Sequence, residues 1–416
     1  MPIIMKPIEM RLFNRPSKKL LFHGFYTLIS SIGPILSVFF ILKVVPVGTW
    51  GAVAFGQAIG LFSSIFVSLG TNVSGSLEIA NLDNSERNAK FLEISVVQVY
   101  ALLPISLISF LITYLLSNDH KLLAGIGTIS INISALTLAW YYFGTGNPRE
   151  LLLIETIPRL FFILISLLTF KFTRNIYIQI VSQSIMYLLL YLYSIKKNFD
   201  ISRIELSKIE IRKSFILKYK QRFKSSFIGL ISALISITPI LVLSLTANRL
   251  VPIWAIIDRV ARYFSIVNDP ITNQYRNITN RNDVKNLRSL MYSQIFIEHL
   301  LSGLALSFIS YFSAPVIING LSSGKLSVNH SDFIWISISL FFNISLKNPI
   351  FILLASRSNL GSIIRILLTT FIISIPMILL FTKYFALKGV CIGYFIMSFV
   401  NSILYFKKFK KSSNLF

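Results

Sequence analysis

The feature that most constrains this chain is a series of apolar segments, each about twenty residues long, that recurs along the whole sequence. A helix of about 20 residues spans the hydrocarbon core of a bilayer. Only 13% of the 416 residues are charged, whereas a soluble chain has about 25%. We therefore expect an all-α polytopic membrane protein with about twelve transmembrane helices, near residues 20–42, 51–73, 92–116, 122–143, 151–170, 176–195, 226–246, 252–272, 292–318, 333–354, 360–382 and 386–406.

The distribution of Lys and Arg predicts the orientation of these helices. With the N-terminus inside, the cytoplasmic segments hold 27 of the 40 basic residues and the opposite side holds 8. Cytoplasmic loops carry an excess of Lys and Arg, so both termini are expected in the cytoplasm. The N-terminal arm is polar and basic and does not read as a cleavable signal. The net charge of +24 is explained by basic loops that meet anionic lipid heads, and nucleic acid is not an expected partner.

Few residues suit metal or disulfide chemistry. Cys391 is the single cysteine, which excludes an intramolecular disulfide and a cysteine-based metal site. The four histidines lack the spacing of metal ligands and are expected at interfaces or in the core: His23, His120, His299 and His330. The sequence predicts no metal and no cofactor, and coupling to H⁺ or Na⁺ remains open.

The two halves of the chain resemble each other. "SIGPIL" begins at Ser31 in the first span and "SITPIL" begins at Ser236 in the seventh, an offset of 205. In both halves a base, a second proline and a tryptophan follow. Six spans per half put both halves in the same orientation, which is a parallel repeat with the substrate expected between the halves. Pro34 and Pro239 would bend their helices and are the expected hinges.

The repeat predicts a division into five parts. These are a cytoplasmic N-terminal arm, an N-lobe of helices 1–6, a basic cytoplasmic linker, a C-lobe of helices 7–12 and a basic cytoplasmic tail, over residues 1–19, 20–195, 196–225, 226–406 and 407–416. The linker has ten basic residues, and its apolar positions permit an amphipathic helix on the membrane surface. A solvated linker is the alternative.

Several motifs together resemble a known family. "WGAVAFGQAIGLFSSIFVSLGTNVSGSLEIA", from Trp50, is similar to the second helix and following loop of the polysaccharide (O-antigen repeat-unit) flippase family. "WYYFGTGNPRE", from Trp140, "IPRLFFIL" around Arg159 and "WAIIDRVARYFSIVNDPITNQ", from Trp254, are also similar to family patterns. The chain departs from the family where a basic residue and a glutamine are usual, at Leu77 and Phe143.

This resemblance implies both a fold and a function. The fold would have two lobes of six helices, as in multidrug-and-toxin extruders and lipid II flippases. The function would be that of a flippase, not an enzyme, in the plasma (inner) membrane of a bacterium. Such a protein moves a polyprenyl-pyrophosphate-linked oligosaccharide of O-antigen, lipopolysaccharide or capsule synthesis to the outer leaflet by alternating access. The implied partners are this glycan, membrane lipids, a glycan polymerase and a chain-length regulator.

Charged residues inside the spans predict where such a substrate would bind. An ionisable group in hydrocarbon costs at least about 2.5–3.5 kcal/mol, so such groups usually face a wet interior. Arg suits phosphate because its planar fork forms two parallel hydrogen bonds. We expect Arg159, Arg259, Arg262 and Lys347 at the pyrophosphate or in its cavity. Arg365 is the weakest candidate, since it lies near a helix end.

The same basic residues have structural alternatives. Glu155 lies one turn before Arg159, and Asp258 lies four residues before Arg262, so each acid could simply neutralise its base. Arg259 could extend outward to the interface. Three acids are candidates for ion coupling, namely Asp258, Asp269 and Glu298.

Two other functions compete with the flippase. A drug or small-molecule cation antiporter of the same fold would favour an acidic, aromatic cavity, but bases outnumber acids within the spans. A membrane glycosyltransferase or polymerase would be expected to carry acids in its first outer loop. That loop is "KVVPVGT" and has none. The in-span bases therefore favour transport of an anion.

Overall fold

The computed structural model describes residues 18–80, 82–198, 211–279, 288–356 and 360–413, and these residues contain helices and no strand. The first half has α2 (Lys18–Val44), α3 (Val47–Ser68), α4 (Thr71–Ala80), α5 (Asn84–Leu116), α6 (Lys121–Ser134), α7 (Ala139–Thr145), α8 (Pro148–Leu151), the π-helix η1 (Leu152–Thr156), α9 (Ile157–Thr173) and α10 (Ile176–Asn198). The second half has α11 (Ile211–Thr246), the 3₁₀ turn η4 (Asn248–Leu250), α12 (Val251–Ile266), α13 (Asp269–Thr279), α14 (Arg288–Leu321), α15 (His330–Phe342), the π-helix η6 (Asn343–Lys347), α16 (Asn348–Ser356) and α17 (Leu360–Ser413).

The expected all-α membrane fold is confirmed. Ten helical stretches among the described residues are long and apolar enough to cross a membrane. The longest of them, α17, contains a non-helical residue at Ala386, and α12 has only 16 residues. The number of twelve spans stays a prediction.

Two predicted spans are interrupted in the structure. The span expected at 252–272 is divided, because α12 ends at Ile266 and α13 begins at Asp269. The span expected at 122–143 is divided between α6 and α7, with residues 135–138 outside both helices. The second division leaves peptide groups without helical partners inside the lobe, and other side chains must satisfy them.

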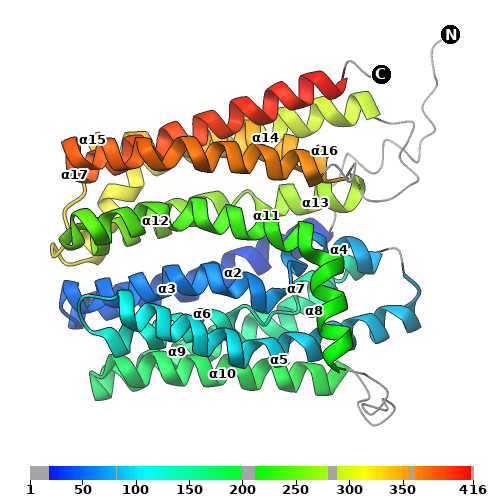
Figure 1. The fold of residues 1–416 in the computed structure, drawn as a ribbon, viewed down its shortest axis with the longest axis horizontal. Helices are drawn as coiled ribbons and strands as arrows, with labels where there is room; N and C mark the ends of the chain where they lie inside the picture. Colours follow the sequence, from blue (N-terminus) through cyan, green and yellow to red (C-terminus); the bar gives the residue numbers. More distant parts are fainter. Residues whose placement is uncertain (1–17, 81, 199–210, 280–287, 357–359, 414–416) are drawn as a thin grey trace.

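The helices form two lobes that lie one above the other in Figure 1. Helices α2–α10 make the lower lobe, and α11–α17 make the upper one. The start of α2 and the end of α17 lie at the right in Figure 1, with α4, α7, α8 and α13, and we name this the terminal end. Contacts of α13 with both α2 and α7 bring the lobes together there.

The basic segment between the lobes is partly helical. Within the predicted linker 196–225, α11 begins at Ile211 and continues into the seventh span, so this part of the linker is helical. The first part of α11 crosses from the lower lobe to the upper one in Figure 1. Near this crossing the buried side chain of Arg222 forms an ion pair of 2.5 Å with Glu78 of α4. Residues 199–210 of the linker, the arm up to residue 17 and the end of the tail lie outside the described residues.

The lobes share one apolar core away from the terminal end. Most of its buried side chains come from α2, α3, α11, α12, α14, α15 and α17, and a few come from α6, α9 and α10. Trp50 and Trp254, which follow the second proline of each half, are both fully buried in it. A Cβ atom on Gly51 would lie 2.8 Å from Cγ of Pro252, so the equivalent segments of the two halves meet directly.

Small residues allow close packing inside the lower lobe. A Cβ atom on Gly56 would lie 1.9 Å from the carbonyl oxygen of Ala124, and one on Gly60 would lie 2.8 Å from that of Thr128. Only glycine permits this approach of α3 to α6. The glycines of α3 therefore set its close spacing to α6, beside the cavity described below.

The fourth helix of each lobe is irregular at a matching place. In the first half, α6 has 14 residues before the chain leaves the helix at Ala135. In the second half, α15 has 13 residues before the π-helix η6 begins at Asn343. This agreement is consistent with the duplication inferred from the sequence. Pro34 and Pro239 lie inside α2 and α11, which stay helical across them.

Candidate functional site

A cavity of about 360 Å³ lies between the lobes, and we name it the central cavity. Side chains of α2, α3, α6, α9 and α10 line it from the lower lobe, and those of α11 and α12 line it from the upper lobe. A second hollow of about 460 Å³, the vestibule, is lined partly by α4, α7 and α13 and so lies toward the terminal end. The two share Tyr26, Ser30, Pro34, Ser134, Arg159, Tyr263 and Ile266 and are therefore continuous.

The lobes are joined at the end opposite the vestibule. The ammonium group of Lys325, from the upper lobe, donates hydrogen bonds to the carbonyl oxygens of Leu42 at 2.8 Å and Lys43 at 3.0 Å. These carbonyls lie at the C-terminal end of α2, where a cation is favourable. The central cavity thus continues toward the terminal end. At the opposite end, polar and apolar contacts join the lobes.

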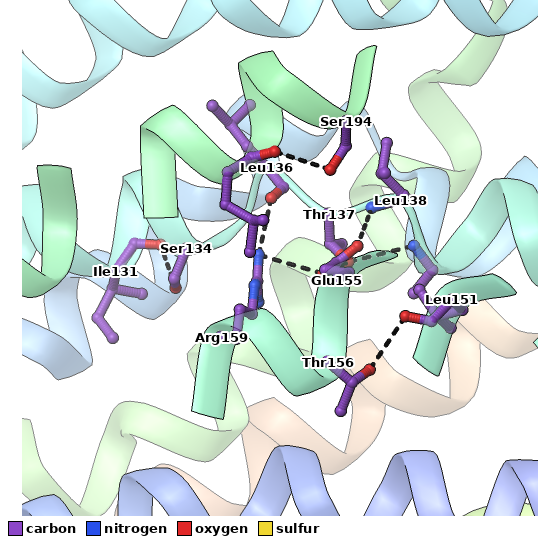
Figure 2. A network of polar contacts seen from close by, with 12 residues as sticks. Ile131, Ser134, Leu136, Thr137, Leu138, Leu151, Glu155, Thr156, Arg159 and Ser194 are labelled. Atoms are coloured by element: carbon purple, nitrogen blue, oxygen red, sulfur yellow. Dashed lines mark hydrogen bonds and ion pairs between the residues drawn. The ribbon is translucent and has the colours of Figure 1, made fainter. Parts of the chain in front are cut away.

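Arg159 lines both hollows and belongs to the network drawn in Figure 2. Its guanidinium forms an ion pair of 3.2 Å with Glu155 and donates a hydrogen bond of 2.9 Å to the carbonyl oxygen of Leu136. It also lies over the ring of Tyr187, 4.9 Å from the centroid. The predicted Glu155–Arg159 pair is confirmed, and 23% of the Arg159 side chain remains exposed to the cavity.

The break between α6 and α7 explains why this pair exists. Glu155 is buried and accepts hydrogen bonds from the hydroxyl of Thr137 and from the backbone N–H of Leu138, both at 2.7 Å. Arg159 satisfies a carbonyl of the same break. Glu155 lies in the π-helix η1, an insertion that commonly occurs at functional sites. Glu155 therefore takes the place of the helical hydrogen-bond partners that the break removes, and Arg159 extends from Glu155 toward the cavity.

Arg259 reaches across the interface from α12 to α3. It donates a hydrogen bond to the amide oxygen of Gln57 and lies over the ring of Trp50, 4.7 Å from the centroid. Both partners are uncharged, and no carboxylate among the described residues forms an ion pair with it. The predicted alternative, in which Arg259 extends outward, is wrong, because the side chain lines the central cavity.

Asp258 and Arg262 form the second ion pair predicted from the sequence. Their charged atoms are 2.5 Å apart, and Asp258 is buried while Arg262 is partly exposed. Both line the central cavity. The charged residues of the cavity wall are therefore three arginines and two carboxylates, and the surplus positive charge belongs to Arg259.

The remaining predicted residues lie at different places. Asp269 begins α13 and lines the vestibule, and Pro34 of α2 lines both hollows. Lys347 ends η6 within the upper lobe and lines neither hollow, and the same holds for Glu298 of α14, which accepts a hydrogen bond of 3.0 Å from Gln294. The structure thus gathers the three arginines and leaves Lys347 apart from them.

Several cavity residues were missed by the sequence analysis. Gln57 was not predicted, because its span consists mostly of small, uncharged residues. A polar side chain within a span nevertheless indicates a position that faces the interior of the protein. Tyr26, Tyr187 and Tyr263 bring hydroxyl groups and rings to the central cavity, and their spacing gives no local sign of this. Within the described part of the chain, no group of three or more His, Cys, Asp or Glu side chains could hold a metal ion.

Comparisons with known proteins place the fold. No protein-family model matches the sequence, and no curated protein is similar to it. Among solved structures, the chain is similar to the eukaryotic MATE transporter AtDTX14, with 15% identity, a TM-score of 0.67 and 94% of each chain covered. It is also similar to an inward-facing multidrug resistance MATE transporter of the MOP superfamily, with 14% identity and a TM-score of 0.64 over 93% of this chain and 98% of the other.

A third similar structure is a MOP superfamily transporter from Pyrococcus furiosus, with 12% identity and a TM-score of 0.59 over 98% of each chain. Its described feature is a binding pocket of reverse polarity that suggests a different function. These likenesses show that the chain has the fold of MATE transporters of the MOP superfamily.

Proposed function

We propose that this protein is a flippase that moves a polyprenyl-pyrophosphate-linked oligosaccharide across a bacterial plasma membrane by alternating access. The fold supports a transporter of two lobes, with the substrate between them. One observation carries the choice of an anion. Arg259 lines the cavity between the lobes and is held by the uncharged Gln57 and Trp50, while the other two arginines have their own carboxylates.

A pyrophosphate group would take the place of Gln57 as the partner of Arg259. A charge-assisted hydrogen bond to phosphate is roughly twice as strong as one to a neutral amide. Arg159 and Arg262 would add donors without losing their carboxylates, since a guanidinium has five N–H groups. The sugars would occupy the vestibule, which is lined by hydroxyl and amide side chains together with Trp140, and the prenyl tail would stay in lipid.

Alternating access would use the contacts at the end opposite the vestibule. The Lys325 contact with α2 and the Arg259 contact with Gln57 both join one lobe to the other. A substrate that removes Arg259 from Gln57 would weaken one of these contacts. Binding and separation of the lobes at that end would thereby be linked.

A small-molecule antiporter is the second candidate, and a specific observation favours it. The central cavity is also lined by Trp50 and three tyrosine rings, which suit flat aromatic cations. The similar structures described as multidrug transporters share the fold. The described reverse polarity of the Pyrococcus furiosus pocket supports the idea that the fold accommodates different substrates.

The test is a comparison of an anionic and a cationic probe. Purified protein in detergent would be titrated with farnesyl pyrophosphate and, separately, with ethidium. We expect Arg259→Gln to weaken farnesyl pyrophosphate binding by roughly 10- to 100-fold, the effect of one hydrogen bond between charged groups, and Arg159→Ala to weaken it as well. Arg365→Gln is the matched control, because Arg365 is exposed on α17 and lines neither hollow.

Each outcome selects one function. Binding of farnesyl pyrophosphate that depends on Arg259 supports the flippase. Binding of ethidium that strengthens in Arg259→Gln, without binding of the pyrophosphate, supports the antiporter. Equal pyrophosphate affinity in Arg259→Gln and Arg365→Gln contradicts the proposed role of the cavity.

A further inference from the structure

A buried histidine of the upper lobe lies in a polar cluster outside the central cavity. His299 is on α14, fully buried, and its Nδ1 atom is 2.8 Å from the carbonyl oxygen of Ile295. A carbonyl can only accept, so Nδ1 carries the hydrogen. In the neutral ring Nε2 is then a lone-pair acceptor. Nε2 is 3.3 Å from the hydroxyl oxygen of Thr272, which donates to it in this state.

The cluster continues from Thr272 along α13 and back to α14. The side-chain amide of Asn268 donates to the Thr272 hydroxyl at 3.2 Å, and the hydroxyl of Ser302 donates to the amide oxygen of Asn268 at 2.8 Å. Asn268 and His299 are both fully buried. The hydrogen bond of Nδ1 to the Ile295 carbonyl thus fixes the tautomer of His299. Nε2 contacts the Thr272 hydroxyl, which can rotate.

We propose that Nε2 of His299 binds a proton and is the site at which transport is coupled to the proton gradient. The inference rests on the proposed transport function. The proton adds to the Nε2 lone pair, and the resulting N–H donates to the oxygen of Thr272. The Thr272 hydroxyl then rotates and donates its hydrogen to the backbone carbonyl oxygen of Asn268, four residues earlier. Threonine commonly uses this partner in helices. No atom other than the added proton enters the cluster.

The donor set favours a proton over a metal ion. Around Nε2 the cluster offers hydroxyl and amide groups, and among the described residues no group of three His, Cys, Asp or Glu side chains is present for a metal. Glu298 is the residue before His299 on α14 and accepts a hydrogen bond of 3.0 Å from Gln294. The other titratable or charged groups on elements packed against α14 are Asp269, Tyr275 and Arg276 on α13, Asp258, Arg259, Arg262 and Tyr263 on α12, His330 and Asp332 on α15 and Lys347 on η6.

Two elements connect this site to the moving parts of the protein. Thr272 contacts His299 and Asn268 contacts Thr272, whereas Asp269 and Asn273 line the vestibule. Neighbouring sides of one short segment therefore meet the proton site and the substrate path. Helix α13 also packs against α2 of the lower lobe. On the other side of His299, the hydroxyl of Ser345 in η6 donates to its backbone carbonyl at 3.4 Å. A charge at His299 therefore acts directly on the joint between α12 and α13.

The first experiment observes the proton itself and needs no substrate. The chain has four histidines, so protein labelled with ¹⁵N-histidine in nanodiscs gives few side-chain signals. The His299 signal is the one lost in His299→Gln and retained in His330→Gln, a control at an exposed histidine. We expect it to change from neutral to protonated between about pH 5 and 8. A signal that stays neutral throughout this range overturns the proposal.

A second variant separates protonation from loss of structure. Thr272→Val keeps the shape of the side chain and removes the acceptor that the imidazolium needs. We expect proton affinity to fall about tenfold, so that the titration moves about one unit lower in pH. An unchanged titration in Thr272→Val would show that the hydroxyl does not stabilise the charged ring and would overturn the mechanism.

The third measurement asks whether the proton moves the lobes. Cys391 is the single cysteine and is buried, so Cys391→Ala gives a background for two spin labels, at Phe25→Cys on α2 and Val267→Cys after α12, both exposed positions. We expect their distance distribution to differ between pH 5.5 and 8.5, and the difference to vanish in His299→Gln. A difference that persists in His299→Gln contradicts the coupling. The proposed function fails separately, through the pyrophosphate titration, which is made at one fixed pH.

Discussion

Glu155 gives a prediction that can be worked out from the structure. The change is Glu155→Gln, which keeps the size of the side chain and removes its charge. The carboxylate now accepts from Thr137, from the backbone of Leu138 and from Arg159 (Figure 2). A glutamine has one acceptor oxygen and an NH₂ group that can only donate. At least one of the three donors therefore loses its partner in a buried place.

The size of the effect follows from the loss of this partner. A buried donor left without an acceptor costs about 1–3 kcal/mol. If the donor is the N–H of Leu138, the segment between α6 and α7 opens more easily by roughly 5- to 150-fold, since 1.4 kcal/mol corresponds to a factor of ten. The rest of the lobe keeps its packing, because the apolar cluster around Leu136 and Leu138 does not change.

Hydrogen exchange of the backbone measures this opening. In detergent or nanodiscs, we expect the peptide that contains residues 135–138 to exchange faster in Glu155→Gln, while peptides of α14 exchange as before. Glu150→Gln is the matched control, because Glu150 is exposed on α8. If Glu155→Gln and Glu150→Gln show the same exchange at residues 135–138, the assignment of Glu155 as the partner of the broken helix is refuted.

Three further substitutions test other contacts. Gly56→Ala places a methyl group 1.9 Å from the Ala124 carbonyl oxygen and should lower the free energy of unfolding by about 1–3 kcal/mol; an unchanged thermal midpoint contradicts this. Lys325→Met removes the bonds to α2 and should lengthen spin-label distances across the end opposite the vestibule; unaltered distances refute a closing role. Asp258→Asn frees Arg262 and should strengthen farnesyl pyrophosphate binding; weaker binding would show that the pair acts as a unit.

The sequence predicted best what depends on short-range spacing. The i, i+4 spacing of an acid and a base predicted both ion pairs, Glu155–Arg159 and Asp258–Arg262, because helix geometry alone brings such residues together. Charges within apolar spans also predicted that Arg259 faces an interior space. A charged guanidinium in contact with lipid costs free energy, so the interior of the protein is favoured for it.

Contacts between distant segments could not be predicted in this way. Gln57 and Arg259 are 202 positions apart and meet only because the lobes pack through their equivalent tryptophan segments. The break after α6 has no proline or glycine, and it is stable because Glu155 of another helix satisfies it. The break before α13 did carry a signal, since Pro270 lies in the first turn of α13, the place in a helix where proline is tolerated.

The central claim is that the cavity between the lobes carries a pyrophosphate-linked glycan across the membrane through Arg259. The most direct measurement uses liposomes with the purified protein and a polyprenyl-pyrophosphate sugar that bears a fluorescent label, with a membrane-impermeant quencher added outside. We expect the wild type and Arg365→Gln to bring label from the inner leaflet to the quencher, and Arg259→Gln to lose most of this activity. Equal quenching in liposomes with wild type, with Arg259→Gln and with no protein would contradict the claim.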